Sequence, residues 1–397
     1  MIRWVQQKKG VAALVAFGLL AAGCGGASDD AASGTDEAGA EEVDEEPEAE
    51  APEDGEDARE EAAATELPGV SLGYLQVLGA SESAIRLEIE TKKIAGLFGW
   101  EWVYCDAEGV PDQMQTCADS LMDQGVDAIV SNGATVEVIT EQLERARDEG
   151  IPYINTGGPQ STYDLYAGAY NPDDEAMAGL LAEWMVENVD EPGEVLVSSV
   201  GFTAWGAERE AALDRVIAGS DFAVADIVDV DFADVVGTAA DATNNWLSQF
   251  PDAKAIWLSF DLAALGAGPI IADLGEEPPA RPLVLTFYAN CITQDQVLSG
   301  GVDAVVEENL EWSAYVAMDQ LAGFFADGTP LSDERRPTYQ SADGEEIQFS
   351  APFILTADDL PDSCEAGVGP YPEPPDAAAA DFRGFFASKW QEEYDIQ

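Results

Sequence analysis

Eleven polar, charged and aromatic residues follow the segments of this 397-residue chain that read as buried strands. In an open parallel sheet, the residues just beyond the carboxyl ends of the strands meet at one edge, where ligands bind. Amide, hydroxyl and charged groups there can hydrogen-bond a polar solute, and aromatic rings can stack on a sugar or on a cation. The candidate ligand-binding residues are Gln76, Ser81, Asn132, Thr156, Trp205, Arg209, Phe232, Phe260, Tyr288, Asn290 and Glu308.

Catalytic chemistry is poorly supported by the composition. The chain has no His, which excludes Ser-His-Asp triads, imidazole proton shuttles, HExxH motifs and most zinc sites. It also lacks a GxSxG motif and a phosphate-binding loop of the P-loop kind. We therefore predict a binding protein and not an enzyme, with no cofactor and no metal. An enzyme remains the weaker alternative, which turnover of a bound compound would revive.

The cysteines predict disulfides in an oxidising compartment. Apart from Cys24, four remain, an even number, and their spacing matches no known metal-ligand pattern, although a four-cysteine metal site is the rival interpretation. Cys105 ends a strand, and Cys117 lies on the buried face of the next helix, so these two should form a local bridge worth about 3 kcal/mol. By elimination, Cys291 pairs with Cys364.

The stretch from Gly125 to Gly158 shows how the candidate residues are positioned. Residues 127–131 (DAIVS) form a short apolar run that predicts a buried strand. Apolar residues then recur at helical spacing over 136–149, Gly150 ends the helix, and 153–156 predicts a second strand. A short crossover between two buried strands indicates a right-handed βαβ unit.

The same alternation runs through most of the chain. A first series begins with a strand at 70–77 and continues to a short strand at 166–170, and a second series begins at 194–199 and ends with a strand at 304–307. A long helix at 312–327, a late strand at 347–355, an irregular Pro-rich stretch at 361–380 and a final helix at 382–390 follow. Two successive series predict an α/β fold of two doubly wound, Rossmann-like lobes.

The N-terminus carries targeting features. Residues 1–23 have a basic start and an apolar run too short to span a membrane, which is typical of a secretory signal peptide. The end of this run resembles a bacterial lipobox, with Ala21 where Leu is more usual, and this implies lipidation of Cys24; a plain signal peptide with a chance Cys is the alternative. Residues 24–67 lack aromatic residues and are acidic, so we expect a disordered tether.

The charge of the remaining chain is strongly negative. Residues 68–397 carry 60 acidic and 13 basic side chains. Nucleic acid and anionic lipid surfaces should therefore be repelled, and we expect contact with a membrane only through the lipid anchor.

Five segments, in their order and spacing, resemble the type I periplasmic binding proteins of the ribose- and galactose-binding branch, which serve ABC importers. They are residues 98–130, 150–156 (GIPYINT), 169–171 (AYN), 206–214 (GAEREAALD) and 255–267 (AIWLSFDLAALGA). DNA-binding repressors share this fold, but no helix-turn-helix precedes it here.

The resemblance implies how the chain is divided between lobes. A hinge of three crossovers would join an N-lobe of residues 68–170 and 309–340 to a C-lobe of residues 171–308 and 341–397. Cys291 and Cys364 would then both lie in the C-lobe, where their bridge pins the tail and leaves the hinge free to close.

The resemblance also bears on single residues. Arg209 matches a ligand-binding Arg of the family, although a surface ion pair with Glu208 or Asp214 is the alternative. Phe232 matches a family aromatic or else belongs to the core, and Asp261 matches an Asp that often caps a helix. Other positions depart from the sugar binders of the family, with residues that cannot hydrogen-bond hydroxyls in the same way: Ser81, Ser83-Ala84, Gly157-Gly158, Phe260 and Tyr288.

The function expected from these observations is capture of a small polar solute, a sugar or sugar-like compound, between two lobes. The resemblance implies a monomer anchored by lipid to the outer face of the cell membrane that delivers its solute to an ABC permease. A receptor subunit of the same fold that reports to a signalling system is one alternative. A solute that is an amine or an aromatic compound is another, because aromatic residues replace several sugar-binding positions.

Overall fold

The computed structural model describes residues 64–157, 164–201, 203–341 and 343–396, and its first sheet is entirely parallel. The strand order is β2-β1-β3-β4-β5, so the chain winds outward in both directions from β1. The strands are β1 (Ser71–Gln76), β2 (Glu101–Asp106), β3 (Ala128–Asn132), β4 (Tyr153–Asn155) and β5 (Gly168–Ala169). The predicted signal peptide, Cys24 and nearly all of the predicted tether lie outside the described residues.

The second sheet has the order β13-β10-β9-β8-β6-β7, and β13 runs antiparallel to β10 at one edge. Its strands are β6 (Glu194–Ser199), β7 (Ala223–Asp229), β8 (Ala255–Leu258), β9 (Leu283–Phe287), β10 (Ala304–Glu307) and β13 (Phe353–Leu355). The two doubly wound lobes expected from the alternating pattern are therefore confirmed. We call the part built on β1–β5 the first lobe and the part built on this sheet the second lobe.

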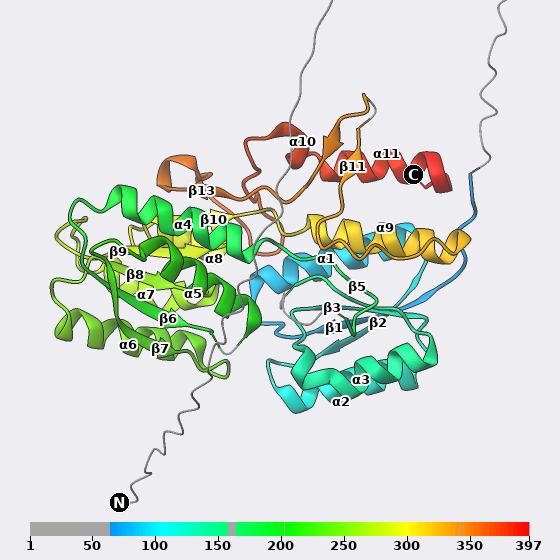
Figure 1. The fold of residues 1–397 in the computed structure, drawn as a ribbon, viewed down its shortest axis with the longest axis horizontal. Coiled ribbons are helices and arrows are strands. Elements are labelled where there is room, and N and C mark those ends of the chain that lie inside the picture. Colours follow the sequence, from blue (N-terminus) through cyan, green and yellow to red (C-terminus); the bar gives the residue numbers. More distant parts are fainter. Residues whose placement is uncertain (1–63, 158–163, 202, 342, 397) are drawn as a thin grey trace, which may run out of the picture. The chain divides into compact units, whose positions relative to one another are not determined.

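Helices cover both faces of each sheet (Figure 1). In the first lobe, α1 (Glu82–Leu97) and α9 (Trp312–Asp327) lie over one face, and α2 (Pro111–Asp123) and α3 (Val136–Glu149) over the other. In the second lobe, α4 (Asp174–Asn188) and α5 (Ala204–Ile217) cover one face. The opposite face is covered by α6 (Val235–Gln249), α7 (Ala264–Ala272) and α8 (Cys291–Leu298).

Strand β1 illustrates why these segments form a two-sided sheet. Its side chains alternate between the faces, so Leu72 and Tyr74 pack with α1 and α9, whereas Leu75 packs with α2 and α3. A strand buried on both faces needs apolar residues at nearly every position, and β1 is buried from Leu72 to Gln76. Gly150 ends α3 in the left-handed conformation, at φ +76°, as predicted.

Both predicted disulfides are present. Cys105 at the end of β2 is bonded to Cys117 in α2, with Cα atoms 5.5 Å apart. Cys291, the first residue of α8, is bonded to Cys364 in the tail, with Cα atoms 5.1 Å apart. The first bridge lies within the first lobe, and the second ties the tail to the second lobe.

The C-terminal segment differs from the sequence-based assignment. After β13 and the short 3-10 helix η2 (Ala357–Asp359), the chain continues into α10 (Ala377–Ala380) and α11 (Phe382–Tyr394). Phe382, Phe386 and Trp390 of α11 are buried in the same core as β1, α1 and α9, so this helix belongs to the first lobe. The prediction that residues 341–397 all lie with the second lobe is therefore wrong for α11, because its aromatic stripe has its complementary surface on α9.

Three smaller differences concern segments whose periodicity is ambiguous. The expected late strand at 347–355 is divided between β12 (Glu346–Ile347), which pairs with β11 (Tyr339–Gln340), and β13. The sequence predicts a helix at 261–274, but residues Asp261–Ala263 form a 3-10 turn, η1, before α7 begins. It also predicts a helix at 293–299, and α8 begins two residues earlier, at Cys291.

Candidate functional site

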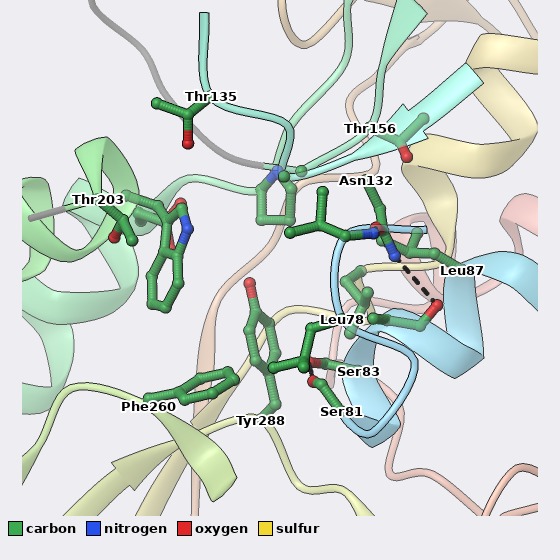
Figure 2. Close-up of a pocket in the computed structure, with 18 of the residues that line it drawn as sticks. Leu78, Ser81, Ser83, Leu87, Asn132, Thr135, Thr156, Thr203, Phe260 and Tyr288 are labelled. Atoms are coloured by element: carbon green, nitrogen blue, oxygen red, sulfur yellow. Dashed lines mark hydrogen bonds between the residues drawn. The ribbon is translucent and has the colours of Figure 1, made fainter. Parts of the chain in front are cut away.

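A pocket with about 800 Å³ of empty space, its mouth included, lies where the carboxyl ends of strands from both lobes meet. Eight of the eleven candidate residues line it: Ser81, Asn132, Thr156, Trp205, Arg209, Phe232, Phe260 and Tyr288. Figure 2 shows Ser81, Ser83 and Asn132 on one side and Thr203 and Phe260 on the other. The structure therefore gathers most of the predicted set, whose role in binding stays a prediction.

The first-lobe side of the pocket presents hydroxyl and amide groups. Asn132 is held firmly, because its Oδ1 accepts a hydrogen bond from Val77 N (3.0 Å) and its Nδ2 donates to the carbonyl of Ala84 (3.2 Å) and to Gln76. The hydroxyls of Ser81 and Ser83 bond each other at 2.8 Å. These groups can exchange their mutual contacts for hydrogen bonds to solute hydroxyls.

The second-lobe side is an aromatic wall that also carries the charged groups of the pocket. The rings of Trp205 and Phe232 each lie against Phe260, with centroids 5.4 and 5.8 Å apart. Leu78 of the first lobe packs against the same apolar cluster, so the two lobes touch beside the pocket. Tyr288 adopts a left-handed backbone conformation, at φ +56°, which is rare outside glycine and often marks a functional position.

Arg209 is fully engaged at the floor of this wall. Its Nε donates to Asp174 Oδ1 (2.7 Å), its Nη1 to the carbonyl of Ser259 (2.7 Å) and its Nη2 to the Tyr288 hydroxyl (3.3 Å). The guanidinium also lies 4.1 Å from the centre of the Phe287 ring. The alternative of a surface ion pair with Glu208 or Asp214 is wrong, because Arg209 is 2% exposed and pairs with Asp174 among the described residues.

The charge of the pocket is balanced. Asp174 and Arg209 are the charged residues among the described residues that line it, and they form an ion pair of 2.6 Å. Burial alone would lower the pKa of Arg209, but the charge and hydrogen bond of Asp174, together with Tyr288 and Asp261, outweigh burial and raise it. The guanidinium therefore stays charged and neutralises its partner, so none of the described lining residues offers a free carboxylate to a cation.

Three candidate residues do not line the pocket. Gln76 lies behind Asn132 and accepts its amide hydrogen bond, so it positions that residue. Asn290 donates to Asp261 and accepts from Arg86 Nη1 (3.0 Å). Asp261, for which the resemblance implies a helix-capping role, is the first residue of η1. Its side chain accepts a hydrogen bond from Asn290 and makes no helix cap. The prediction that strand-end polar groups all face the solute is therefore wrong at positions where a buried neighbour already forms a hydrogen bond with that group.

Glu308, the third of these residues, lies in the segment that joins β10 to α9 and so connects the lobes. Its carboxylate accepts from Asp173 N (2.7 Å), Trp312 Nε1 (3.2 Å) and Ser350 Oγ (2.6 Å). Burial raises the pKa of Glu308 to about 8, although the hydrogen bonds from Ser350 and Asp173 favour the ionised form. Glu308 thus links three connecting segments and does not face the pocket.

We expect Glu308→Gln to flatten the dependence of stability on pH. The pKa of Glu308 is about 8 in the folded protein, against 4.5 for an ordinary glutamate. Between these values the folded protein keeps a proton that the unfolded chain has lost, so wild-type stability falls as the pH rises from about 5 to 8. Urea unfolding at several pH values measures this slope. The exposed Glu346→Gln serves as control, and parallel profiles for Glu308→Gln and wild type would contradict the assignment.

Sequence reasoning missed a side chain that is among the most densely bonded of the described residues. Arg86 of α1 is 2% exposed and uses all five N–H groups, on Glu311 (2.7 and 2.8 Å), Glu307 (3.1 and 3.3 Å) and Asn290 (3.0 Å). Glu82 lies one helical turn earlier, also buried. The signal was present, since both residues fall on the buried stripe of α1, but an amphipathic pattern does not show that charged residues occupy it.

Two other pocket residues were missed although each lies only four positions beyond the end of a predicted strand. Thr203 caps α5, accepting from Gly206 N at 3.0 Å, and Asp174 is buried in the first turn of α4. In the part of the chain that the structure describes, no helix is long and apolar enough to cross a membrane. The same residues contain no cluster of His, Cys, Asp and Glu that could hold a metal ion.

Known proteins with similar sequences and structures identify the family to which this fold belongs. A family model described as a periplasmic binding protein domain matches residues 87–328. The xylitol-binding protein of Mycolicibacterium smegmatis is 25% identical over 188 residues, covering 44% of this chain and 50% of that protein, so the match spans about half the length of that relative.

Solved structures show the same fold. A galactofuranose binding protein superposes with a TM-score of 0.62 at 18% identity, over 73% of this chain and 95% of that chain. An ABC transporter solute binding protein from Agrobacterium vitis, with bound allitol, superposes with a TM-score of 0.62 at 19% identity, over 73% of this chain and 96% of that chain. Since the family model covers more than half of its residues, this chain belongs to the periplasmic binding protein domain family, with the type I fold, and the relatives that it matches are named as binding proteins of small solutes.

Proposed function

We propose that this protein captures a small uncharged solute, a sugar or polyol, between its two lobes and delivers it to an ABC permease. The observation that carries the proposal is the composition of the pocket, with hydroxyl and amide groups on the first-lobe side and an aromatic wall on the second. Such a surface matches a solute that has hydroxyls along one side and an apolar C–H face on the other. The named ligands of the relatives, xylitol and allitol, are polyols of this kind.

The balanced charge of the pocket supports an uncharged solute over an amine. An ammonium group needs a free carboxylate or a closed aromatic cage, and the pocket carboxylate of Asp174 is already paired with Arg209. A carboxylate solute would need free guanidinium donors, and Arg209 already donates to Asp174, Ser259 and Tyr288. Either charged solute would have to break a buried ion pair on binding, which costs several kcal/mol.

The proposal includes the finer points implied by the N-terminus. Lipidation of Cys24 would anchor the protein on the outer face of the cell membrane, and the acidic tether of residues 24–67 would let it reach the permease. Mass spectrometry of the N-terminal peptide tests the lipid, and solute uptake after deletion of the gene tests the transport role. Unchanged uptake would favour a receptor subunit.

A thermal-shift screen across polyols, pentoses, hexoses, amines and sugar acids tests the solute class. A solute present at about 100 times its dissociation constant stabilises the folded protein by about 2.7 kcal/mol, which raises the melting temperature measurably. We expect shifts from one or a few uncharged sugars or polyols, starting with xylitol, and none from amines or acids. A shift produced by an amine alone would overturn the uncharged-solute proposal.

A further inference from the structure

The C-terminal tail makes an additional connection between the lobes. The chain crosses from one lobe to the other near residues 170–173, 308–311 and 349–353, as expected for the type I fold. It then leaves β13 in the second lobe and crosses back, since α11 is buried in the core of the first. Figure 1 shows α11 next to α9, whereas β13 lies with the second lobe. We call residues 364–371, in the middle of this fourth crossing, the tail strap.

One end of the tail strap is fixed to the second lobe. Cys364 is bonded to Cys291, the first residue of α8. The carbonyl of Pro370, near the other end, accepts a hydrogen bond from Gln294 Nε2 of the same helix at 3.2 Å. The tail strap is therefore held against the start of α8 by one covalent bond and one hydrogen bond.

The same residues contact α1 of the first lobe. Gly367 adopts φ +75° and lies so close to α1 that a side chain there would meet Ile89 at 3.3 Å. The ring of Tyr371 lies 4.1 Å from the guanidinium of Arg86, and its hydroxyl donates to Glu82 Oε1 at 3.0 Å. Tyr371 thus covers the two buried charged residues of α1.

Those two residues are themselves bonded to the second lobe. The carboxylate of Glu82 accepts from the backbone N–H groups of Cys291 (3.1 Å) and Ile292 (3.2 Å), and so caps a helix of the opposite lobe. Arg86 bonds Asn290 of the second lobe and Glu307 at the end of β10. Four features therefore meet at the start of α8: the tail strap, the Cys291–Cys364 disulfide, Glu82 and Arg86.

We propose that the tail strap is an interlobe latch that limits how far the lobes separate when no solute is bound. Opening the lobes moves α1 away from α8, which requires Tyr371 to leave Arg86 and Glu82, while the Cys291–Cys364 bond keeps the strap on α8. None of these residues lines the pocket, so the latch acts on the lobe equilibrium and makes no contact with the solute. A protein held less open has less far to close, which strengthens its apparent affinity.

The test compares the two disulfides of the chain. In Cys291→Ser/Cys364→Ser the strap loses its covalent attachment, whereas Cys105→Ser/Cys117→Ser removes a bridge of the same chemistry within the first lobe. X-ray scattering of the solute-free protein should give a larger radius of gyration for the first variant and an unchanged one for the second. The best solute of the thermal-shift screen should bind the first variant about fivefold more weakly.

A second pair of variants separates the latch from a general loss of stability. Tyr371→Phe keeps the ring over Arg86 and loses the bond to Glu82, and Tyr371→Ala loses both, so the radius should rise in that order. Hydrogen exchange at the amides of Cys291 and Ile292 should accelerate in parallel, since Glu82 protects them. Radii and exchange rates equal to wild type in both series would overturn the latch. If no solute is found, scattering and exchange still decide it, because neither requires one.

Discussion

Replacing Arg86 by methionine is expected to lower the free energy of unfolding by about 3–5 kcal/mol. The substitution keeps most of the side-chain volume and removes the charge from a site where Arg86 is 2% exposed. It leaves the carboxylate of Glu307, which is 0% exposed, without a cationic partner among the described residues, and that of Glu311, which is 2% exposed, with only Arg383 at 3.9 Å. An uncompensated buried charge costs far more than the loss of one hydrogen bond.

The pKa shifts of this cluster agree in direction with that expectation. Burial would raise the pKa of Glu311, but the Arg86 guanidinium outweighs burial and lowers it. Once Arg86 is removed, the effect of burial should dominate, so the variant should take up a proton that the wild type does not hold near neutral pH. Its stability should then improve relative to wild type as the pH falls.

Arg145→Met is the matched control for this prediction. Arg145 also makes three ion pairs, with Asp119, Asp123 and Glu149, at 2.8–3.1 Å, but its side chain is 34% exposed and its partners are exposed as well. Water solvates both charges in the folded and unfolded chain, so we expect a change close to zero. Urea unfolding of the two variants provides the comparison, and equal losses would show that the burial of Arg86 is not what matters.

The second large effect is expected at Arg209. Arg209→Met should weaken solute binding by about 1.5–3 kcal/mol, which corresponds to roughly 10- to 150-fold in the dissociation constant. The guanidinium holds Asp174 and the Tyr288 hydroxyl at the pocket wall, so its loss releases the groups that shape the site. Calorimetric titration with the solute found in the screen measures the change.

Two further variants distinguish binding from stability at this position. Arg215→Met lies on the same helix and removes an ion pair with Glu175 whose side chains are 57% and 62% exposed, so it should bind solute like wild type. Arg209→Met/Asp174→Leu leaves no buried unpaired carboxylate and should regain stability without regaining affinity. If the double variant binds as tightly as wild type, the pair serves only the fold.

The architecture of both lobes was predictable because it rests on local periodicity. Runs such as residues 128–130 and 255–258 are apolar at every position, and each is followed by a helical pattern, so a parallel two-sided sheet is the arrangement that buries them. The carboxyl ends of parallel strands always meet at one edge, and for this reason eight candidate residues taken from strand ends line one pocket.

The remaining candidates show where that rule stops. Asn290 and Glu308 also follow strands, yet their polar groups are hydrogen-bonded within the protein. Asn290 bonds Arg86 and Asp261, and Glu308 bonds Trp312 and Ser350. Each of these partners is at least four positions away in the chain, and most are tens to hundreds of positions away. No pattern of spacing shows which of two nearby groups a buried side chain will bond.

The chain by itself determined the two lobes, the disulfide pairing and the sheet edge from which eight pocket-lining residues come, because each follows from short-range periodicity or from counting. Tertiary structure decided that Arg209 pairs with Asp174, that Arg86 joins α1 to the opposite lobe and that α11 returns to the first lobe. Arg209 and Asp174 are 35 positions apart in the chain, and Arg86 and Asn290 are 204 positions apart. Helix α11 lies tens to hundreds of positions from the elements it packs with in the first lobe. Burial in a shared core brings such residues together, and that depends on how whole faces pack and not on the local sequence.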